Sequence, residues 1–119
     1  MRCLALLAIV FLLAGTAGAA VKEPICVTPD PPIAGQPAVW QWMSSKGDQV
    51  DLAINCADGG QYGGMLKSQD SDGTYTNKDL GVVYPSPTHC TYTVYVYTFH
   101  PSGVYSVSSF NGEFDVVAP

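Results

Sequence analysis

The stretch VDLAINC, residues 50–56, alternates one set of side chains strictly with another. Val50, Leu52, Ile54 and Cys56 point one way, and the residues between them point the other way. A period of two is typical of a β-strand with one face against a core. We therefore predict a half-buried strand here, whose buried face ends in Cys56.

A second stretch, CTYTVYVYTF at residues 90–99, is the longest predicted strand. One of its faces consists of Cys90, Tyr92, Val94 and Val96. The opposite face consists of Thr91, Thr93, Tyr95, Tyr97 and Phe99. Because both faces carry apolar side chains, the pattern favours a central strand over an edge strand.

After residue 20 the chain has no helical period of useful length. It is rich in Val, Thr, Tyr and Gly, and turn residues recur at intervals of about ten positions, which is typical of a β-sandwich. The other extended segments are predicted at 25–28, 38–43, 65–67, 74–76, 80–83, 104–110 and 113–117. We predict an all-β, immunoglobulin-like β-sandwich of about seven strands that forms a single domain, residues 21–119.

Three details of this domain follow from local sequence. Trp40 and Trp42 share a strand face with Ala38, and we expect that face to lie in the core. The glycine-rich residues 58–64 are predicted to form a loop. Asn111-Gly112 fits a type I′ hairpin or a glycine bulge within one strand, and the sequence does not separate the two.

Residues 1–20 have the pattern of a cleaved signal peptide. Arg2 precedes an apolar run from Leu4 to Leu13, and Ala17-Gly18-Ala19 supplies the small residues of a cleavage site. The run is shorter than the roughly 20 residues of a membrane span, although an N-terminal anchor is the alternative. Cleavage after Ala19 or Ala20 leaves about 99 residues. With no GPI-anchor signal at the C-terminus, we expect a secreted, extracellular protein without a membrane anchor.

The charge balance argues against anionic partners. Loss of Arg2 takes the formal net charge from −5 to about −6 and leaves the chain without arginine. Phosphate contacts need clustered Lys and Arg. We therefore expect binding neither to nucleic acid nor to anionic membranes.

Three cysteines remain after the predicted cleavage: Cys26, Cys56 and Cys90. In an immunoglobulin-like sandwich the third and sixth strands are antiparallel neighbours. Cys56 is then the last inward residue of one strand and Cys90 the first inward residue of the other. Opposite Cα atoms about 4.5–5.5 Å apart lie within disulfide reach. We predict a Cys56–Cys90 bond worth roughly 3–4 kcal/mol, with Cys26 free or able to link two molecules into a dimer.

The sequence holds no recognisable catalytic apparatus. His89 and His100 are interpreted as loop residues, and no Gly-x-Ser-x-Gly elbow accompanies the serines. Asp48, Asp51 and Asp58 cluster in sequence, but they fit solvated surface acids better than a catalytic carboxylate pair. We expect no enzymatic activity.

We also expect neither a metal nor another cofactor. No Cys-x-x-Cys is present, and the histidines do not have the spacing of zinc ligands. Asp70-Ser71-Asp72-Gly73 resembles the opening of a calcium loop, but the downstream Glu is missing. A turn with side-chain hydrogen bonds explains this segment better.

The candidate ligand-binding residues are Tyr95, Tyr97 and Phe99. They form an aromatic ladder on the outward face of the longest strand, and aromatic rings with polar groups suit a sugar ring or a protein partner. The alternative is ordinary cross-strand packing, since aromatic residues are favoured in strands.

The order of several motifs resembles a known family. These motifs are AGQPAVWQW at 34–42, QVDLAI at 49–54, GTYT at 73–76, YTVYV at 92–96, and Ser109 followed by FDV at 114–116. Together they resemble the immunoglobulin-like domain of fungal Ser/Thr-rich GPI-anchored cell-wall proteins, the domain type that also opens the fungal cell-wall β-1,6-glucan synthesis proteins. The resemblance implies an extracellular, non-enzymatic fungal domain connected with cell walls, or a secreted effector.

These observations give a leading hypothesis and an alternative. The first is a small secreted non-enzymatic binding or structural protein, fungal in origin, that acts at the cell wall or a host surface. Its partner is then a cell-wall polysaccharide or a host protein. The alternative is a secreted lipid-binding sandwich or a host-directed effector.

Overall fold

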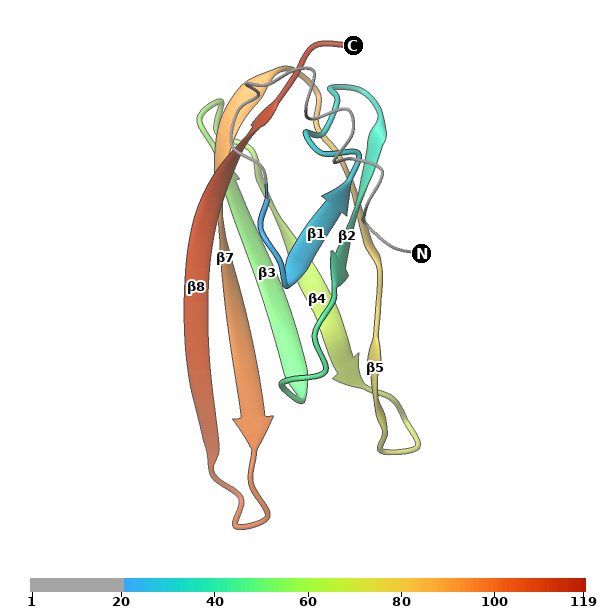
Figure 1. Cartoon of the computed structure of the whole chain (residues 1–119), viewed down its shortest axis with the longest axis vertical. Helices are drawn as coiled ribbons and strands as arrows, with labels where there is room; N and C mark the ends of the chain where they lie inside the picture. Colours follow the sequence, from blue (N-terminus) through green and yellow to red (C-terminus); the bar gives the residue numbers. More distant parts are fainter. Residues whose placement is uncertain (1–20) are drawn as a thin grey trace.

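The computed structural model describes residues 21–119, and the predicted signal peptide at 1–20 lies outside them. The secondary structure of this part consists of β-strands, which form two antiparallel sheets that pack face to face (Figure 1). The eight strands are β1 (Ile25–Thr28), β2 (Pro37–Trp42), β3 (Gln49–Cys56), β4 (Gln61–Gln69), β5 (Tyr75–Asn77), β6 (Leu80–Val83), β7 (Thr88–Phe99) and β8 (Tyr105–Val116).

The three-stranded sheet has the order β1-β2-β6, and the five-stranded sheet has the order β5-β4-β3-β7-β8. The predicted β-sandwich is therefore confirmed, with eight strands instead of about seven. β7 pairs on one side with β3 and on the other with β8, so it is the central strand that its two apolar faces indicate.

The predicted disulfide is confirmed. Cys56 lies directly opposite Cys90 in the β3–β7 pair, and the two residues are bonded with a Cα–Cα distance of 4.0 Å. The prediction of a free Cys26 concerned the processed chain. In the full-length chain Cys26 is buried in β1 and is disulfide-bonded.

The prediction of a loop at 58–64 is wrong in its second half, because β4 begins at Gln61. The glycines of this strand serve close packing rather than a turn. A Cβ atom on Gly63 would lie 2.6 Å from the carbonyl oxygen of Leu52, and one on Gly64 would lie 2.8 Å from Leu80 Cδ1. Glycine in a strand often marks such a close approach.

For Asn111-Gly112 the hairpin alternative is wrong, and the other alternative is right that one strand continues through these residues but wrong that it contains a bulge. β8 runs without interruption from Tyr105 to Val116, and its pairing with β7 has no register shift. Gly112 lies opposite Tyr92, and a Cβ at Gly112 would lie 2.5 Å from the Tyr92 hydroxyl oxygen. The glycine therefore leaves room for the tyrosine ring.

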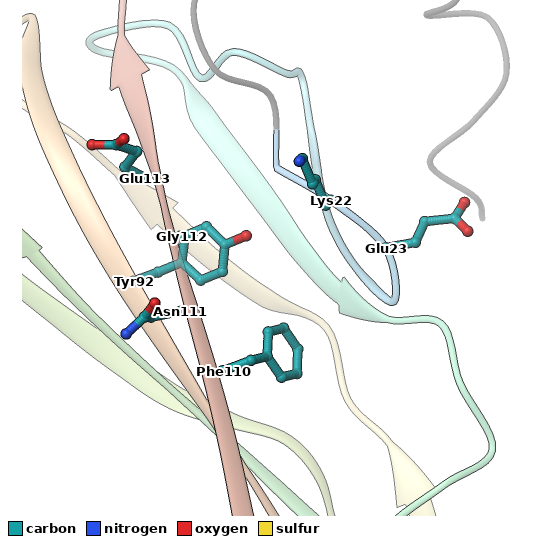
Figure 2. A pocket seen from close by; sticks show the side chains of 7 residues that line it. All are labelled: Lys22, Glu23, Tyr92, Phe110, Asn111, Gly112 and Glu113. Carbon is teal, nitrogen blue, oxygen red and sulfur yellow. The ribbon is translucent and has the colours of Figure 1, made fainter.

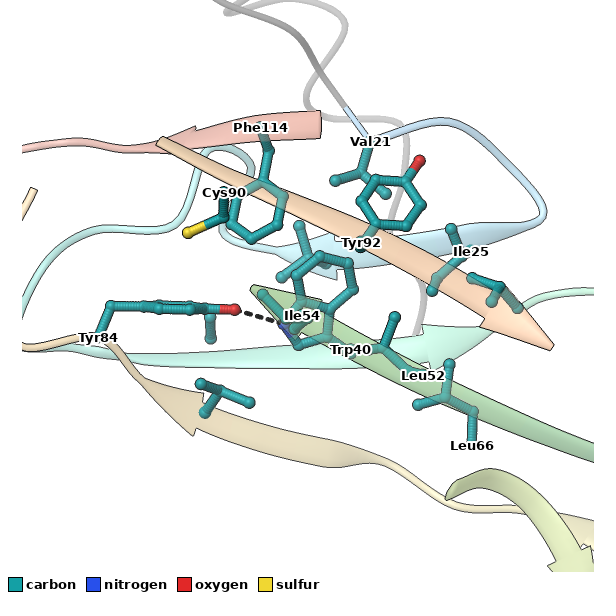
Figure 3. Close-up of a cluster of buried hydrophobic side chains, with 14 of the residues drawn as sticks. Val21, Ile25, Trp40, Leu52, Ile54, Leu66, Tyr84, Cys90, Tyr92 and Phe114 are labelled. Carbon is teal, nitrogen blue, oxygen red and sulfur yellow. Dashed lines mark hydrogen bonds between the residues drawn. The ribbon is translucent and has the colours of Figure 1, made fainter. Parts of the chain in front are cut away.

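Aromatic rings fill the centre of the sandwich (Figure 3). Trp40 and Phe114 are fully buried and meet edge to face, with their ring centroids 5.2 Å apart. The Trp40 indole N–H donates a hydrogen bond of 3.2 Å to the hydroxyl of Tyr84. Burial raises the pKa of the Tyr84 hydroxyl above its ordinary value. Ala38 and Trp42 are buried too, so the predicted core face of β2 is confirmed.

The two sheets differ in length. The hairpin of β7 and β8 continues past the other strands, and its turn forms the lower end of the molecule in Figure 1. Residues 105–109 of β8 are all exposed, whereas Phe114 and Val116 are buried. The three-stranded sheet thus covers only one end of this hairpin.

Candidate functional site: an exposed aromatic face

The outer face of the five-stranded sheet carries the predicted ligand-binding residues. Tyr95, Tyr97 and Phe99 alternate along β7 with the residues that point to the core, as the period of two predicts. Tyr95 is 38 % exposed and Phe99 40 % exposed, while Tyr97 is half-buried. The structure therefore places all three side chains on one outward face.

The structure adds residues from other strands to this face. Phe99 pairs with Tyr105 and Tyr97 pairs with Val107, and partners in an antiparallel pair point to the same side. The Tyr75 ring, from β5, stacks on Phe99 with a centroid distance of 6.3 Å. We call Tyr75, Tyr95, Tyr97, Phe99, Tyr105 and Val107 the aromatic face.

The turn of the hairpin brings Tyr105 into this face. The His100 N–H donates to the Val104 carbonyl, and the Gly103 N–H donates to the His100 carbonyl, so the chain reverses and sets Tyr105 opposite Phe99. The sequence contained this signal in His100-Pro101-Ser102-Gly103. Tyr75 had no comparable signal, because its contact depends on how β5 lies relative to β7.

Three rings of the aromatic face, those of Tyr75, Tyr97 and Phe99, lie nearly parallel to one another. Tyr97 and Phe99 stack with an interplanar angle of 10° and a centroid distance of 6.4 Å. Tyr75 and Phe99 stack at 19°. Tyr105 contacts both β7 rings at tilted angles, with centroids 5.8 Å from each. The contacts hold the rings against one another while more than half of the Tyr105 residue stays exposed.

Polar groups border the aromatic face on β3. Gln49 lies opposite Tyr97 and Asp51 lies opposite Tyr95, and the Gln49 side-chain amide donates to Asp51 Oδ1 at 3.2 Å. Asp48 fixes the end of β7, because its Oδ2 accepts from the Phe99 N–H at 2.8 Å. The border thus offers hydrogen-bonding groups beside apolar rings.

The three acids that cluster in sequence lie at different places along β3. Asp48 precedes the start of β3, Asp51 lies on its outer face, and Asp58 follows its end. Asp58 accepts a hydrogen bond from the Gly60 N–H instead. The strand therefore separates Asp48 from Asp58 by its whole length.

The segment 70–73 forms a turn with side-chain hydrogen bonds. Asp72 Oδ1 accepts from the Thr74 N–H at 3.0 Å, and these bonds lower the pKa of the Asp72 carboxyl. Asp70 forms an ion pair of 2.6 Å with Lys78. Within residues 21–119 no group of His, Cys, Asp and Glu side chains is arranged to hold a metal ion.

The interpretation of His89 as a loop residue is wrong, because His89 is the second residue of β7. Its Nδ1 lies 2.6 Å from Asp115 Oδ1 and its Nε2 lies 2.9 Å from Glu113 Oε1, both on β8. These hydrogen bonds, that of Asp115 first, raise the pKa of His89 above 6.5. His100 lies in the hairpin turn, as expected, with Nε2 3.3 Å from Ser106 Oγ.

A pocket of about 420 Å³ lies elsewhere, between the N-terminal segment and β8 (Figure 2). Its lining residues are Lys22, Glu23, Tyr92, Phe110, Asn111, Gly112 and Glu113. Charged side chains border it, and sequence analysis did not single it out. It is distinct from the aromatic face, because Tyr92 and Phe110 belong to the inward-pointing set of their strands.

Comparisons with known proteins give no relative from which a role is transferred. No family model matches the chain, and neither the curated proteins nor the solved structures contain a match. Among the described residues no helix is long and apolar enough to span a membrane.

Proposed function

We propose that the protein is a small secreted, non-enzymatic binding module whose aromatic face binds an uncharged polysaccharide of a cell wall. The intramolecular Cys56–Cys90 bond indicates an oxidising setting, and the predicted signal peptide supports export. The resemblance to fungal cell-wall domains supports the same ligand class.

One observation carries this proposal: the two faces of the β7–β8 hairpin exchange polarity along its length. In the half that the second sheet covers, apolar side chains point inward and polar side chains point outward. Past that sheet the inward residues are Thr98, Ser106 and Ser108, all exposed. The outward residues there are Tyr97, Phe99, Tyr105 and Val107. No core requires these apolar side chains, and an exposed apolar patch marks an interaction site.

The chemistry of the aromatic face favours a sugar over an apolar or anionic ligand. A pyranose ring presents C–H groups on its faces and hydroxyls at its rim. Stacked rings suit the former, while tyrosine hydroxyls and the Gln49 amide suit the latter. The formal net charge of −5 disfavours an anionic partner.

The lipid-binding alternative has no supporting observation. A sandwich that carries an acyl chain needs space between its sheets. Here Trp40, Tyr84 and Phe114 occupy the centre, in contact at centroid distances of 5.2 and 5.9 Å (Figure 3).

The proposal is tested by retention on insoluble β-glucan and on chitin. We expect wild-type protein to be retained on at least one of them, and we expect Tyr95→Ala/Tyr97→Ala and Phe99→Ala/Tyr105→Ala to lose retention. Val83→Ala is the matched control, because Val83 is 53 % exposed on the other sheet. Circular dichroism establishes that each variant is folded. Equal retention of wild type and both double variants would exclude the aromatic face as a glycan site.

A further inference from the structure

The first described residue is docked into the core. Val21 is only 8 % exposed and belongs to the hydrophobic cluster between the sheets. Its backbone nitrogen donates a hydrogen bond of 3.2 Å to Asp30 Oδ2. The next residue, Lys22, is held as well, because its backbone N–H bonds to the Tyr92 hydroxyl. The chain at residue 21 is therefore fixed before β1 begins.

The Asp30 carboxyl group is hydrogen-bonded through only one of its two oxygens. Its second carboxyl oxygen, Oδ1, is buried and has no hydrogen-bond partner. A buried carboxylate without a compensating charge is costly, and burial raises the pKa of Asp30 to about 6. The other titratable groups nearby do not compensate for it: Tyr92 is neutral at pH 7, and Lys22 and Glu23 are exposed.

We propose that the chain is cleaved between Ala20 and Val21, and that the freed α-ammonium group of Val21 forms an ion pair with the Asp30 carboxylate. This inference rests on the predicted signal peptide and selects one of its two cleavage sites. After cleavage at Ala19 the amine would belong to Ala20, and Val21 would keep an amide with one hydrogen.

The cleavage is an ordinary peptide hydrolysis by a signal-type peptidase. The bond between the Ala20 carbonyl carbon and the Val21 nitrogen breaks, and water supplies the hydroxyl that makes the Ala20 carboxylate. The nitrogen takes up protons and becomes an ammonium group, because the ordinary pKa of an α-amine is about 7.7–8.0.

The α-ammonium group of Val21 supplies the hydrogen-bond donors that the Asp30 carboxylate lacks. An amide offers one hydrogen to Oδ2, whereas an ammonium group has three donors and is able to reach both carboxyl oxygens. The opposite charges lower the pKa of Asp30 and raise the pKa of the amine. Processing thus supplies the donor that Asp30 Oδ1 lacks.

The test expresses the whole chain with its own leader in a secreting host. Intact mass and N-terminal sequencing of the secreted protein are expected to give Val21 as the first residue. The second readout is the rate at which acetic anhydride acylates the α-amine near pH 7, followed by peptide mapping to separate it from the lysines. We expect this rate to be lower than in Asp30→Asn by about tenfold, as a pKa raised by about one unit requires.

Glu23→Gln is the matched control, because it removes one negative charge beside the N-terminus from an exposed side chain. We expect it to acylate at the wild-type rate. A first residue other than Val21, or equal rates in wild type and Asp30→Asn, would overturn the proposal. A fast rate in Glu23→Gln would also contradict it, because the effect would then be general to nearby charge.

A third measurement needs no variant and decides the question if Asp30→Asn does not fold. NMR titration of the Asp30 carboxyl carbon in the secreted protein is expected to give a pKa below the ordinary 3.8. A pKa near 6, the value that burial and the opposing Val21 hydrogen bond together give the uncleaved chain, would show that no ion pair forms.

Discussion

The two ends of the β7–β8 hairpin are built from the same two strands, yet their faces have opposite polarity. Near the disulfide the core side carries Cys90, Tyr92, Val94, Phe114 and Val116, and the solvent side carries His89, Thr91, Glu113 and Asp115. Near the turn, serine and threonine occupy the inner side and aromatic residues the outer side. The two ends differ because the three-stranded sheet covers the hairpin only near the disulfide.

This comparison separates the demands of folding from those of binding. Where β1 and β2 cover the hairpin, burial of apolar area stabilises the fold and selects apolar inward residues. Where nothing covers it, the inward residues are polar, as solvent requires. The outward rings there stabilise little and are free to meet a ligand. Stability is expected to depend on one end and binding on the other.

The largest expected effect comes from truncating one ring at each end. Phe114→Ala removes a fully buried ring that contacts Trp40 and Tyr84, and we expect a loss of about 3–5 kcal/mol in the free energy of unfolding. Phe99→Ala removes a ring that is 40 % exposed, and we expect a loss of about 1 kcal/mol or less. Urea unfolding measures both. Equal losses would contradict the comparison.

Removal of the disulfide ranks next. Cys56 and Cys90 are 34 positions apart in sequence, and closing a loop of that length is worth about 3–4 kcal/mol on the chain-entropy model. The double variant Cys56→Ala/Cys90→Ala is expected to lose this amount in urea unfolding while its retention on glycan at low temperature is kept. Loss of binding in a variant that is still folded would show that the disulfide end of the hairpin affects binding at the turn end, and this would contradict the comparison.

A smaller effect is expected from Gly112→Ala. The new Cβ would lie 2.5 Å from the Tyr92 hydroxyl oxygen and 2.6 Å from the carbon that bears it, inside the covered half. Overpacking of this kind costs about 1–3 kcal/mol. Gly81→Ala is the control, because a Cβ there meets no atom within 4 Å. Thermal unfolding is expected to lower the Tm of the first variant and not of the second.

The smallest effect is a pH dependence at His89. Its folded-state pKa is raised above 6.5, chiefly by the hydrogen bond to Asp115 and then by that to Glu113. The protonated form is therefore favoured by folding, so this contribution to stability is complete below pH 6.5 and is lost as pH rises through the folded pKa. NMR titration of the imidazole is expected to give a pKa above 6.5.

The variant Asp115→Asn removes the larger cause of this shift and is expected to lower the pKa of His89. An unchanged value would show that the close contact between His89 and Asp115 is not maintained in solution. Because all three side chains are exposed, the effect is expected to weaken with added salt.

Periodicity predicted a large part of this structure. The inward faces of β3 and β7, the Cys56–Cys90 bond and the outward position of Tyr95, Tyr97 and Phe99 all follow from a period of two and from antiparallel pairing. These features depend on residues near one another in a strand or directly opposite in a pair.

What the sequence did not indicate depends on contacts between distant segments. Gly63 and Gly64 are typical of a loop until the neighbouring Leu52 and Leu80 are placed against them. His89 had no visible partner until β8 aligned Glu113 and Asp115 beside it. In the same way, no local pattern reveals where the second sheet ends, and this boundary leaves the inward residues Thr98, Ser106 and Ser108 exposed.

The central claim is that ligand binding is confined to the aromatic face. Its most direct test is an NMR titration of the protein, labelled with ¹⁵N, with soluble β-glucan oligosaccharides. The account predicts saturable shifts of the amides around Tyr95, Tyr97, Phe99 and Tyr105, with the amides next to Cys56 and Cys90 unchanged. Shifts centred instead on Tyr92 and Phe110, or no shifts with any β-glucan or chitin oligomer, would contradict it.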